Sequence, residues 1–258
     1  MTKKPSVIAI FETWLDDQNT KYYNLSGYSS YHLVRTERVH GGVSLYISDK
    51  LISSQVKSLS YISDIIEILT AKFSIDQESY TICSIYRPDS KDKNVDKFTN
   101  ELLTILNDNN IKNDKIILIG DMNINLLEHS SDQPTNEYLN ALQTISFHPH
   151  ITKPTRFPDQ NQKGSPSLLD HLFTNFFYKS IPGILHYPVS DHLPVFISLD
   201  CDKSIPQIHE ITTRTINDRN KSLFTRKLNE IDWENMLSSN DLNINFSIFN
   251  FNSINEMF

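Results

Sequence analysis

The chain has 258 residues, of which 38% are hydrophobic, and it carries a formal net charge of −7. This length suits one domain of about 200 residues with an appendage, and no stretch approaches the roughly 20 apolar residues of a membrane-spanning helix. The acidic balance argues against a protein that coats DNA through a broad basic surface. It leaves room for an enzyme that meets nucleic acid locally, because a bound divalent cation supplies positive charge where a phosphate sits.

The N-terminal segment and the cysteines give no sign of secretion. Met1–Pro5 is basic, but the apolar region of a signal peptide does not follow it. Cys83 and Cys201 are too few for a disulfide scaffold and have no metal-ligand spacing. We therefore expect an intracellular protein with two reduced structural thiols.

Short runs of β-branched and aromatic residues alternate with polar breaks over roughly the first 200 residues, as is typical of a sheet-rich α/β domain. Apolar residues recur at helical spacing in Val95–Asn107 and Asn136–Ile145, which predicts two helices. The strand runs lack strict alternation, so we expect a layered sandwich with its sheet covered on both faces. Gly41-Gly42 allows a tight turn or a close backbone approach before the second strand. The predicted strands are Val7–Phe11, Val43–Ile47, Ile66–Phe73, Tyr80–Tyr86, Ile116–Ile119, Leu168–Thr174 and Val195–Leu199.

The character of the chain changes after Asp200. Arg214–Arg226 is rich in Asn, Lys and Arg, and Leu223, Phe224, Leu228 and Ile231 fit an amphipathic helix ending near Trp233. We divide the chain into a domain of residues 1–203 and a helical connector of residues 204–258. The apolar stretch Asn240–Phe258 fits either a domain cut short or an aggregation-prone tail.

Polar clusters stand at or near the ends of five predicted strands. Carboxylates gathered in this way are costly unless a cation or a proton-transfer task needs them. Several carboxylates with one histidine therefore indicate a metal-assisted hydrolytic site. The clusters are Glu12, Tyr86-Arg87-Pro88, Gly120-Asp121-Met122-Asn123, Asp170-His171 and Ser190-Asp191-His192.

Gly120–Asn123 is the strongest local signal. Residues two apart in an extended segment project to the same side, so we expect Asp121 and Asn123 to face one pocket. The carboxylate could take a proton from water, while the amide holds a phosphate oxygen or the nucleophile. The alternative is a plain Asp/Asn turn where a strand leaves the sheet.

Asp191 and His192 are adjacent and point to opposite sides, so a different carboxylate is needed to orient the imidazole of His192. Asp170 lies among apolar residues, where an unpaired charge is costly, and a hydrogen bond from His192 would offset that cost. The alternatives are a surface histidine and an Asp170 that caps a neighbouring loop. His171 is expected to be an ordinary, partly buried histidine.

Glu12 could ligate Mg²⁺, which takes carboxylates and keeps several waters. Tyr86 and Arg87 could donate hydrogen bonds to a phosphate. Each also has a simpler interpretation, because Glu12 could cap a turn and Tyr-Arg-Pro could be an ordinary strand exit. Their order along the chain favours the functional interpretation.

Seven motifs follow one another between residues 5 and 200. They are Glu12-Thr13-Trp14-Leu15, Gly41–Ile47, Tyr86-Arg87-Pro88, Gly120-Asp121-Met122-Asn123, Thr152–Arg156, Ser167–His171 and Ser190-Asp191-His192. In this order they resemble the exonuclease–endonuclease–phosphatase superfamily, and more narrowly the apurinic-type endonuclease domain of LINE-class, non-LTR retrotransposons. Residues 205–258 resemble the connector that such elements place before a reverse transcriptase.

The resemblance implies a four-layer α/β sandwich in which two packed mixed sheets are flanked by helices. It also implies that the first strand of the family, with an asparagine near the metal, is missing here. The implied cofactor is Mg²⁺, for which Mn²⁺ can substitute, held by Glu12 with help from Asp191.

The resemblance further implies that Asp121 activates the attacking water and that Asn123 positions it or the phosphate. His192, oriented by Asp170, would stabilise the pentacovalent transition state. Hydrogen bonds to phosphate or in support of the site are implied for Tyr86, Arg87, Ser167, Ser190 and Thr155.

The implied reaction is Mg²⁺-dependent nicking of nuclear DNA, which leaves a 3′-hydroxyl that primes a reverse transcriptase encoded in the full-length element. A second possibility is a phosphodiesterase or phosphatase of the same superfamily with an RNA, lipid or inositol substrate, since fold does not choose among them. A third is a catalytically inactive retrotransposon remnant. Against the third stands the full set Glu12, Asp121, Asn123, Asp170, Asp191 and His192.

Overall fold

The structure is a computed structural model that describes residues 4–35, 40–75, 78–89, 94–158, 164–176, 180–187 and 190–199, and residues 222, 225, 226, 229 and 230. The chain forms two compact units, Met1–Ser204 and Ile205–Phe258. Cys201 and the predicted helix before Trp233 lie largely outside the described residues. Within the described part, no helix has the length and apolar character needed to cross a membrane.

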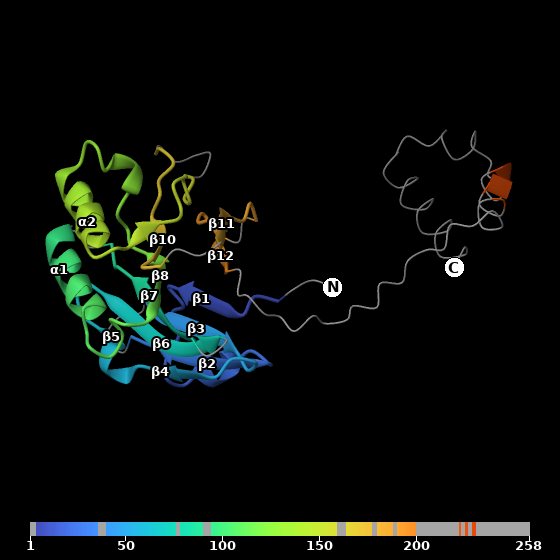
Figure 1. The fold of residues 1–258 in the computed structure, drawn as a ribbon, viewed down its shortest axis with the longest axis horizontal. Helices are drawn as coiled ribbons and strands as arrows, with labels where there is room; N and C mark the ends of the chain where they lie inside the picture. Colours follow the sequence, from blue (N-terminus) through green and yellow to red (C-terminus); the bar gives the residue numbers. More distant parts are fainter. Residues whose placement is uncertain are drawn as a thin grey trace. The chain divides into compact units, whose positions relative to one another are not determined.

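A seven-stranded mixed sheet forms the centre of the first unit (Figure 1). β7 and β8 are parallel, and the other neighbours in the sheet are antiparallel. The strand order is β4 (Ser53–Gln55), β6 (Glu67–Ile75), β7 (Glu78–Tyr86), β8 (Lys115–Asp121), β10 (Asp170–Thr174) and β9 (His148–Pro149), with β5 (Tyr61–Ile62) paired to β6.

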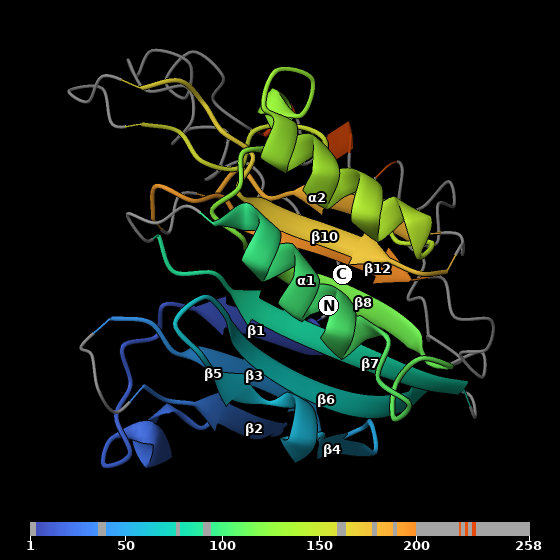
Figure 2. The ribbon, with the colours of Figure 1, turned by 90° about the vertical axis from the view of Figure 1, so that its left-hand side faces the viewer.

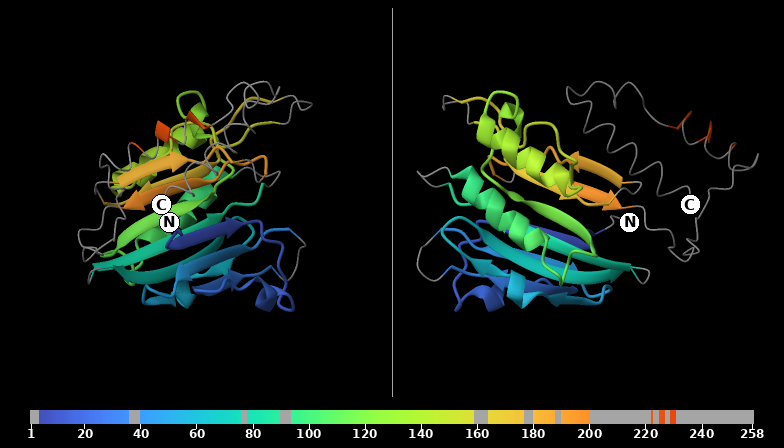
Figure 3. Two further views of the ribbon diagram at one scale, coloured as in Figure 1. Left: turned by 90° about the vertical axis from the view of Figure 1, so that its right-hand side faces the viewer. Right: turned by 60° about the vertical axis from the view of Figure 1, so that its left-hand side comes forward.

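A three-stranded antiparallel sheet lies on one side of the central sheet, and two helices cover the other side (Figures 2 and 3). The small sheet has the order β1 (Val7–Phe11), β3 (Val43–Ser48) and β2 (Tyr28–Leu33). The helices are α1 (Val95–Leu106) and α2 (Gln133–Thr144). Three short 3-10 helices, η1 (Thr20–Tyr23), η2 (Lys57–Leu59) and η3 (Leu126–Glu128), lie in connections.

Two hydrophobic cores fill the spaces on either side of the central sheet. Successive residues of a strand point to opposite faces, so the central strands feed both cores. Ile68 and Cys83 belong to the core that contains helix side chains, whereas Leu69 and Ile82 belong to the core beneath β1 and β3. Burial on both faces explains why these strands read as continuous apolar runs.

The structure shows three of the four expected layers. The outer side of the small sheet is covered, among the described residues, by the irregular segment that contains η1 rather than by an α-helix. Tyr46 of β3 donates its hydroxyl hydrogen bond to the carbonyl oxygen of Tyr23 at 2.8 Å and is only 4% exposed. The irregular segment therefore contacts the small sheet at this point.

β11 (Ser180–Ile184) and β12 (Val195–Leu199) form a separate two-stranded antiparallel sheet. Of the described strands, only β3 pairs with β1. The second edge of β1 therefore presents backbone groups without a strand partner in the described part of the chain. The missing first strand stays a prediction.

Candidate active site

Polar side chains from four neighbouring strands stand in one row at an end of the central sheet. Tyr86 ends β7 and Asp121 ends β8, and the register of the parallel pair places them opposite each other. The antiparallel neighbours begin at the same end, with Glu67 of β6 opposite Tyr86 and Asp170 of β10 opposite Asp121. Residues opposite each other in a sheet point to the same face, so all four point to one side.

Glu12 joins this row from the small sheet. It follows β1 directly, and its Oε1 accepts a hydrogen bond of 2.6 Å from the Tyr86 hydroxyl. Burial, the hydrogen bond to Glu12 and the neighbouring carboxylates raise the pKa of Tyr86 above its ordinary value. The Tyr86 hydroxyl therefore keeps its proton at neutral pH and can act as a donor.

Asp121 is the most deeply buried carboxylate of the predicted site, with 7% of its surface exposed. Its Oδ1 accepts a hydrogen bond of 3.1 Å from the backbone N–H of Asn123. Burial, with the charges of Asp170 and Glu12, raises the pKa of Asp121 to about 7. A carboxylate with this pKa can accept a proton near neutral pH.

The expected common face of Asp121 and Asn123 is wrong in its geometry. β8 ends at Asp121, and Asn123 has a left-handed backbone with φ of 47°, so the two residues are not on one extended strand. The side-chain amide of Asn123 donates a 2.8 Å hydrogen bond to the carbonyl oxygen of Arg87. Asn123 thereby ties the loop after β8 to the loop after β7.

The buried position of Arg87 does not fit the expected role of a phosphate ligand. Its side chain is 3% exposed, lies 5.7 Å from the centre of the Phe98 ring, and donates a 3.1 Å hydrogen bond to the carbonyl oxygen of Asn123. The guanidinium is thus enclosed between α1 and the loop. Arg87 and Asn123 together hold the two strand ends in place.

His192 and Asp170 form the contact that the sequence predicts. The Nδ1 atom of His192 lies 2.8 Å from Oδ2 of Asp170. Burial lowers the pKa of His192, but the hydrogen bond and charge of Asp170, with the charges of Asp121 and Asp191, outweigh it and raise that pKa above the ordinary value. The pair therefore favours a charged imidazolium beside Asp121.

Thr155 and Ser190 support this pair through backbone contacts. The Oγ1 atom of Thr155 accepts hydrogen bonds from the N–H groups of Leu169 and Asp170, at 3.2 and 3.1 Å. Ser190 Oγ accepts a 3.1 Å hydrogen bond from the N–H of His192. Both arrangements fix the backbone that carries the His192–Asp170 pair.

Asp191 has a different partner from that of His192. Its Oδ2 lies 2.8 Å from Nε of Arg156 in a half-exposed ion pair. Burial raises the pKa of Asp191, but Arg156 outweighs that effect and holds this pKa below the ordinary value. Ser167 reaches this region through backbone pairing with Arg156, which also bridges to His192.

His171 is structural. It is 1% exposed, its Nδ1 lies 3.1 Å from the Tyr138 hydroxyl, and its Nε2 lies 2.9 Å from the carbonyl oxygen of Ile124. It is more deeply buried than expected. Both ring nitrogens are thus occupied away from the row of carboxylates.

Asp121, Asp170 and His192 have ligand atoms within 4.8 Å of one another, the one such group that the described residues form. Glu12 and Asp191, which the family resemblance assigns to the metal, are outside this group. The charges of Glu12 and Asp170 both add to the raised pKa of Asp121, so a cation among these carboxylates would be stabilising. Carboxylate oxygens are the ligands that Mg²⁺ and Mn²⁺ prefer.

Glu67 was not among the predicted site residues. It is fully buried at the start of β6, directly beside Tyr86 in the sheet. Its carboxylate accepts a 2.6 Å hydrogen bond from the N–H of Gly42 and lies 3.1 Å from Nη2 of Arg35. A single Glu inside the apolar run Ile65–Leu69 was the available signal, because a buried charge needs a partner.

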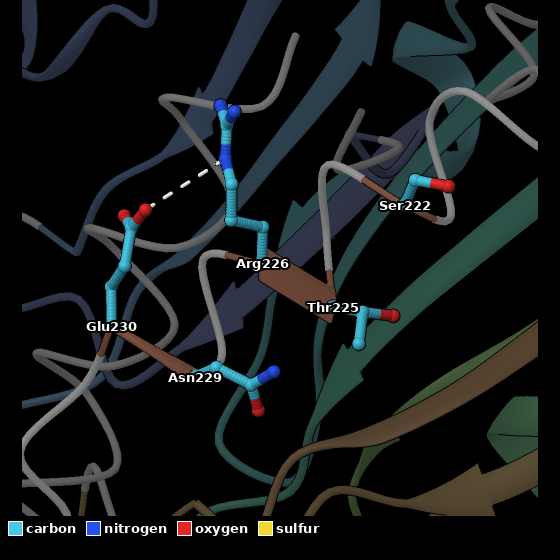
Figure 4. A pocket seen from close by; sticks show the side chains of 5 residues that line it. All are labelled: Ser222, Thr225, Arg226, Asn229 and Glu230. Atoms are coloured by element: carbon cyan, nitrogen blue, oxygen red, sulfur yellow. Dashed lines mark ion pairs between the residues drawn. The ribbon is translucent and has the colours of Figure 1, made fainter.

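The C-terminal unit has a pocket of its own among its described residues (Figure 4). Its one ion pair in Figure 4 joins Nε of Arg226 to Oε1 of Glu230 at 3.7 Å. All its lining residues come from one short stretch, and none is a predicted site residue. They are Ser222, Thr225, Arg226, Asn229 and Glu230.

Comparisons with solved structures give the same fold at low sequence identity. The endonuclease domain of TRAS1, a telomere-specific non-LTR retrotransposon, matches with a TM-score of 0.55 and 14% identity over 69% of this chain and 83% of that domain. An AP endonuclease from Archaeoglobus fulgidus matches with 0.52 and 14% over 76% and 90%. TDP2 from D. rerio, complexed with a single-strand DNA product, matches with 0.50 and 12% over 76% and 86%.

No curated protein matches the chain significantly by sequence. The family model described as "Endonuclease/Exonuclease/phosphatase family" matches residues 2–192. That span begins before Glu12 and ends at His192, so it contains the complete row of polar residues at the sheet end. The chain belongs to the endonuclease/exonuclease/phosphatase family.

Proposed function

We propose that the protein is a Mg²⁺-dependent phosphodiesterase that nicks DNA and leaves a 3′-hydroxyl to prime reverse transcription. The observation that carries the proposal is the meeting of Glu12, Tyr86, Asp121, Asp170 and His192 at one end of the central sheet. A phosphodiester needs a base for water, positive charge for its oxygens and fixed geometry. These side chains supply such groups in one place.

Asp121 is the base in this proposal. Its pKa of about 7 lets it take a proton from an attacking water at neutral pH. His192, held by Asp170, keeps a proton and stabilises the negative charge that builds on the phosphate oxygens. Tyr86 donates its hydroxyl hydrogen bond to Glu12 and can donate it to a phosphate oxygen instead.

A divalent cation would supply Lewis acidity toward the phosphate and a lower pKa for bound water. Glu12 is the carboxylate that would hold it, which leaves Asp121 free to act as the base. Asp191 can join Glu12 once its ion pair with Arg156 opens.

A nucleic acid is favoured over a lipid or inositol phosphodiester by an exposed aromatic residue close to Glu12 in the chain. Trp14 lies two residues after Glu12, is 54% exposed and contacts the ring of His40 at 4.6 Å in an edge-on geometry. Stacking of a base on an aromatic side chain contributes about 1–3 kcal/mol. A role on chromosomal DNA, with a reverse transcriptase as partner, would place the protein in the nucleus.

The alternative substrates are RNA, lipid or inositol phosphodiesters, and the alternative state is an inactive remnant. The test is relaxation of supercoiled plasmid with Mg²⁺ or EDTA by the unmodified protein, Asp121→Ala and His192→Ala, with His186→Ala as a control for an exposed histidine. We expect Mg²⁺-dependent nicking that both site variants abolish and the control retains. Hydrolysis of a small phosphodiester without nicking would indicate a substrate other than DNA. Absence of any hydrolysis by the folded protein would contradict the proposed enzymatic function.

A further inference from the structure

We propose that Glu67 is a positioning residue of this site. Its buried carboxylate holds the Gly41-Gly42 turn, and that turn holds the backbone of residues 12–14, so that Glu12 stays beside Tyr86. The inference rests on the proposed function, because it concerns the same site. It assigns a purpose to a buried charge that the chemistry described above does not use.

The contacts of Glu67 account for both of its carboxylate oxygens. The side chain has no exposed surface, Oε2 accepts the 2.6 Å hydrogen bond from the Gly42 N–H, and Oε1 lies 3.1 Å from Nη2 of Arg35. Oε1 accepts no hydrogen bond from a described residue, so its contact with Arg35 is that of an ion pair alone. Burial of an ion pair is costly, so its presence at this point suggests that the turn requires it.

The Gly41-Gly42 turn in its turn fixes the backbone of the segment that follows β1. The N–H of Thr13 donates to the carbonyl oxygen of Gly42 at 3.2 Å, and the N–H of Trp14 donates to that of Gly41 at 2.9 Å. One face of the turn therefore meets Glu67, and its carbonyl groups meet the residues directly after Glu12.

The backbone of this segment needs such support. Glu12 and Trp14 have φ values of 52° and 53°, in the left-handed region that residues with a side chain rarely adopt. The packing is also tight: a Cβ at Gly41 would lie 2.4 Å from Oε1 of Glu67, and a Cβ at Gly42 would lie 2.7 Å from Oγ1 of Thr13. Glu67, the turn and Thr13 thus form one packed unit that imposes the conformation of Glu12.

A glutamine cannot replace Glu67 at this position. The carboxylate accepts from Gly42 on one oxygen and faces Arg35 with the other. A glutamine has one acceptor oxygen and one NH₂ group, so its NH₂ would face a donor whichever way it turned. Replacing Arg35 by methionine removes one of the two donors and lets glutamine accept from Gly42.

The experiment compares the unmodified protein, Glu67→Gln and Arg35→Met/Glu67→Gln in a Trp233→Phe background, where Trp14 is the remaining tryptophan. Two quantities are measured: the Mg²⁺ concentration that gives half-maximal plasmid nicking, and quenching of Trp14 fluorescence by acrylamide without Mg²⁺. For Glu67→Gln we expect a rise of about 10- to 100-fold in the Mg²⁺ concentration and stronger quenching of Trp14. The double variant should recover toward the unmodified protein in both.

Asp114→Asn is the matched control. Asp114 also has a shielded carboxylate, which accepts a 2.5 Å hydrogen bond from Thr81 and pairs with Lys72 at 2.8 Å. It precedes β8, whereas Asp121 ends that strand, about 23 Å away at 3.3 Å per residue. The Asp114→Asn variant should have a lower thermal stability than the unmodified protein. It should require the same Mg²⁺ concentration for half-maximal nicking and show the same quenching of Trp14.

The proposal is overturned if folded Glu67→Gln matches the unmodified protein in both quantities, or if Asp114→Asn changes them equally. It is also overturned if the double variant folds but remains as impaired as Glu67→Gln, since the Gly42 hydrogen bond would then not be the cause. If Glu67→Gln does not fold, recovery of folding and Trp14 shielding in the double variant supports the proposal. Absence of nicking by the unmodified protein would reject the proposed function, while Trp14 quenching would still test the role of Glu67.

Discussion

Asp170 sets the protonation of His192 at the scale of single residues. Its hydrogen bond and negative charge outweigh burial and raise the pKa of His192, so the protonated imidazole persists to higher pH. If the protonated form is the active one, the rate falls as pH rises through this pKa. The alkaline limb of the pH–rate profile therefore reports the contact with Asp170.

We expect Asp170→Asn to move that alkaline limb to lower pH by about one unit, because a neighbouring opposite charge shifts a pKa by at least about one unit. The measurement is kcat/KM for nicking against pH, with saturating Mg²⁺. An alkaline limb that stays in place in an active variant would show that Asp170 does not tune His192.

Asp121 is a source of instability in the folded protein without metal. Its folded pKa of about 7 lies above the ordinary value of 3.8. As pH rises between these values, the unfolded chain loses this proton while the folded protein retains it, so stability falls. Above about pH 7 the folded state bears the full cost of the buried charge.

Asp121→Asn should therefore be more stable than the unmodified protein by about 1–4 kcal/mol at pH 8 in EDTA. The gain should vanish below about pH 3, where Asp121 is largely protonated in both states. Denaturant unfolding at the two pH values measures this. A variant that is no more stable at the higher pH would contradict the assigned environment of Asp121.

Individual contacts differed in how well the sequence predicts them. The His192–Asp170 contact follows from a charge among apolar residues, because burial demands a partner. The geometry at Asn123 does not follow, since it depends on where β8 ends and on a left-handed residue. Arg87 was expected to bind phosphate but is enclosed by the protein. Glu67, a carboxylate inside an apolar run, was not predicted as a site residue but supports the site.

Among the elements, the long buried strands and both helices lie close to their predicted positions. The strands without a prediction, β2, β4, β5, β9 and β11, are short, polar or at the margins of their sheets, where an apolar run is not required. Helix α2 begins at Gln133 rather than Asn136. Asp132 accepts a hydrogen bond from the N–H of Thr135, and Pro134 lies in the first turn, both ordinary start signals.

The pairing of β7 with β8 positions Tyr86 and Asp121 and depends on Gly120. A Cβ at Gly120 would lie 1.8 Å from the carbonyl oxygen of Ile85, a backbone atom that cannot move aside. Gly120→Ala should therefore lower the free energy of unfolding by more than about 4 kcal/mol or prevent folding.

Gly164→Ala is the control for this prediction. Among the described residues, a Cβ there would meet the side chain of Pro158 alone, at 3.3 Å, so its effect should be small. Thermal or denaturant unfolding compares the two variants. Equal stability of Gly120→Ala and the unmodified protein would mean that β7 and β8 are not in the described register.

For the whole molecule, the central feature is that residues distant in sequence meet at one place. Glu12 follows a strand of the small sheet, Tyr86 and Asp121 end strands of the central sheet, and His192 comes from the segment before β12. The sequence predicts the sandwich through its alternation of runs and breaks. It does not predict three layers with an irregular cover, because covering segments such as η1 lack a strong apolar period.

The most direct test of this account is anomalous X-ray diffraction from crystals of the full chain grown with Mn²⁺. We predict one strong manganese peak at the end of the central sheet, in contact with the carboxylate of Glu12. Manganese absent from that sheet end, or bound only at the Arg226–Glu230 pocket of the C-terminal unit, would contradict it.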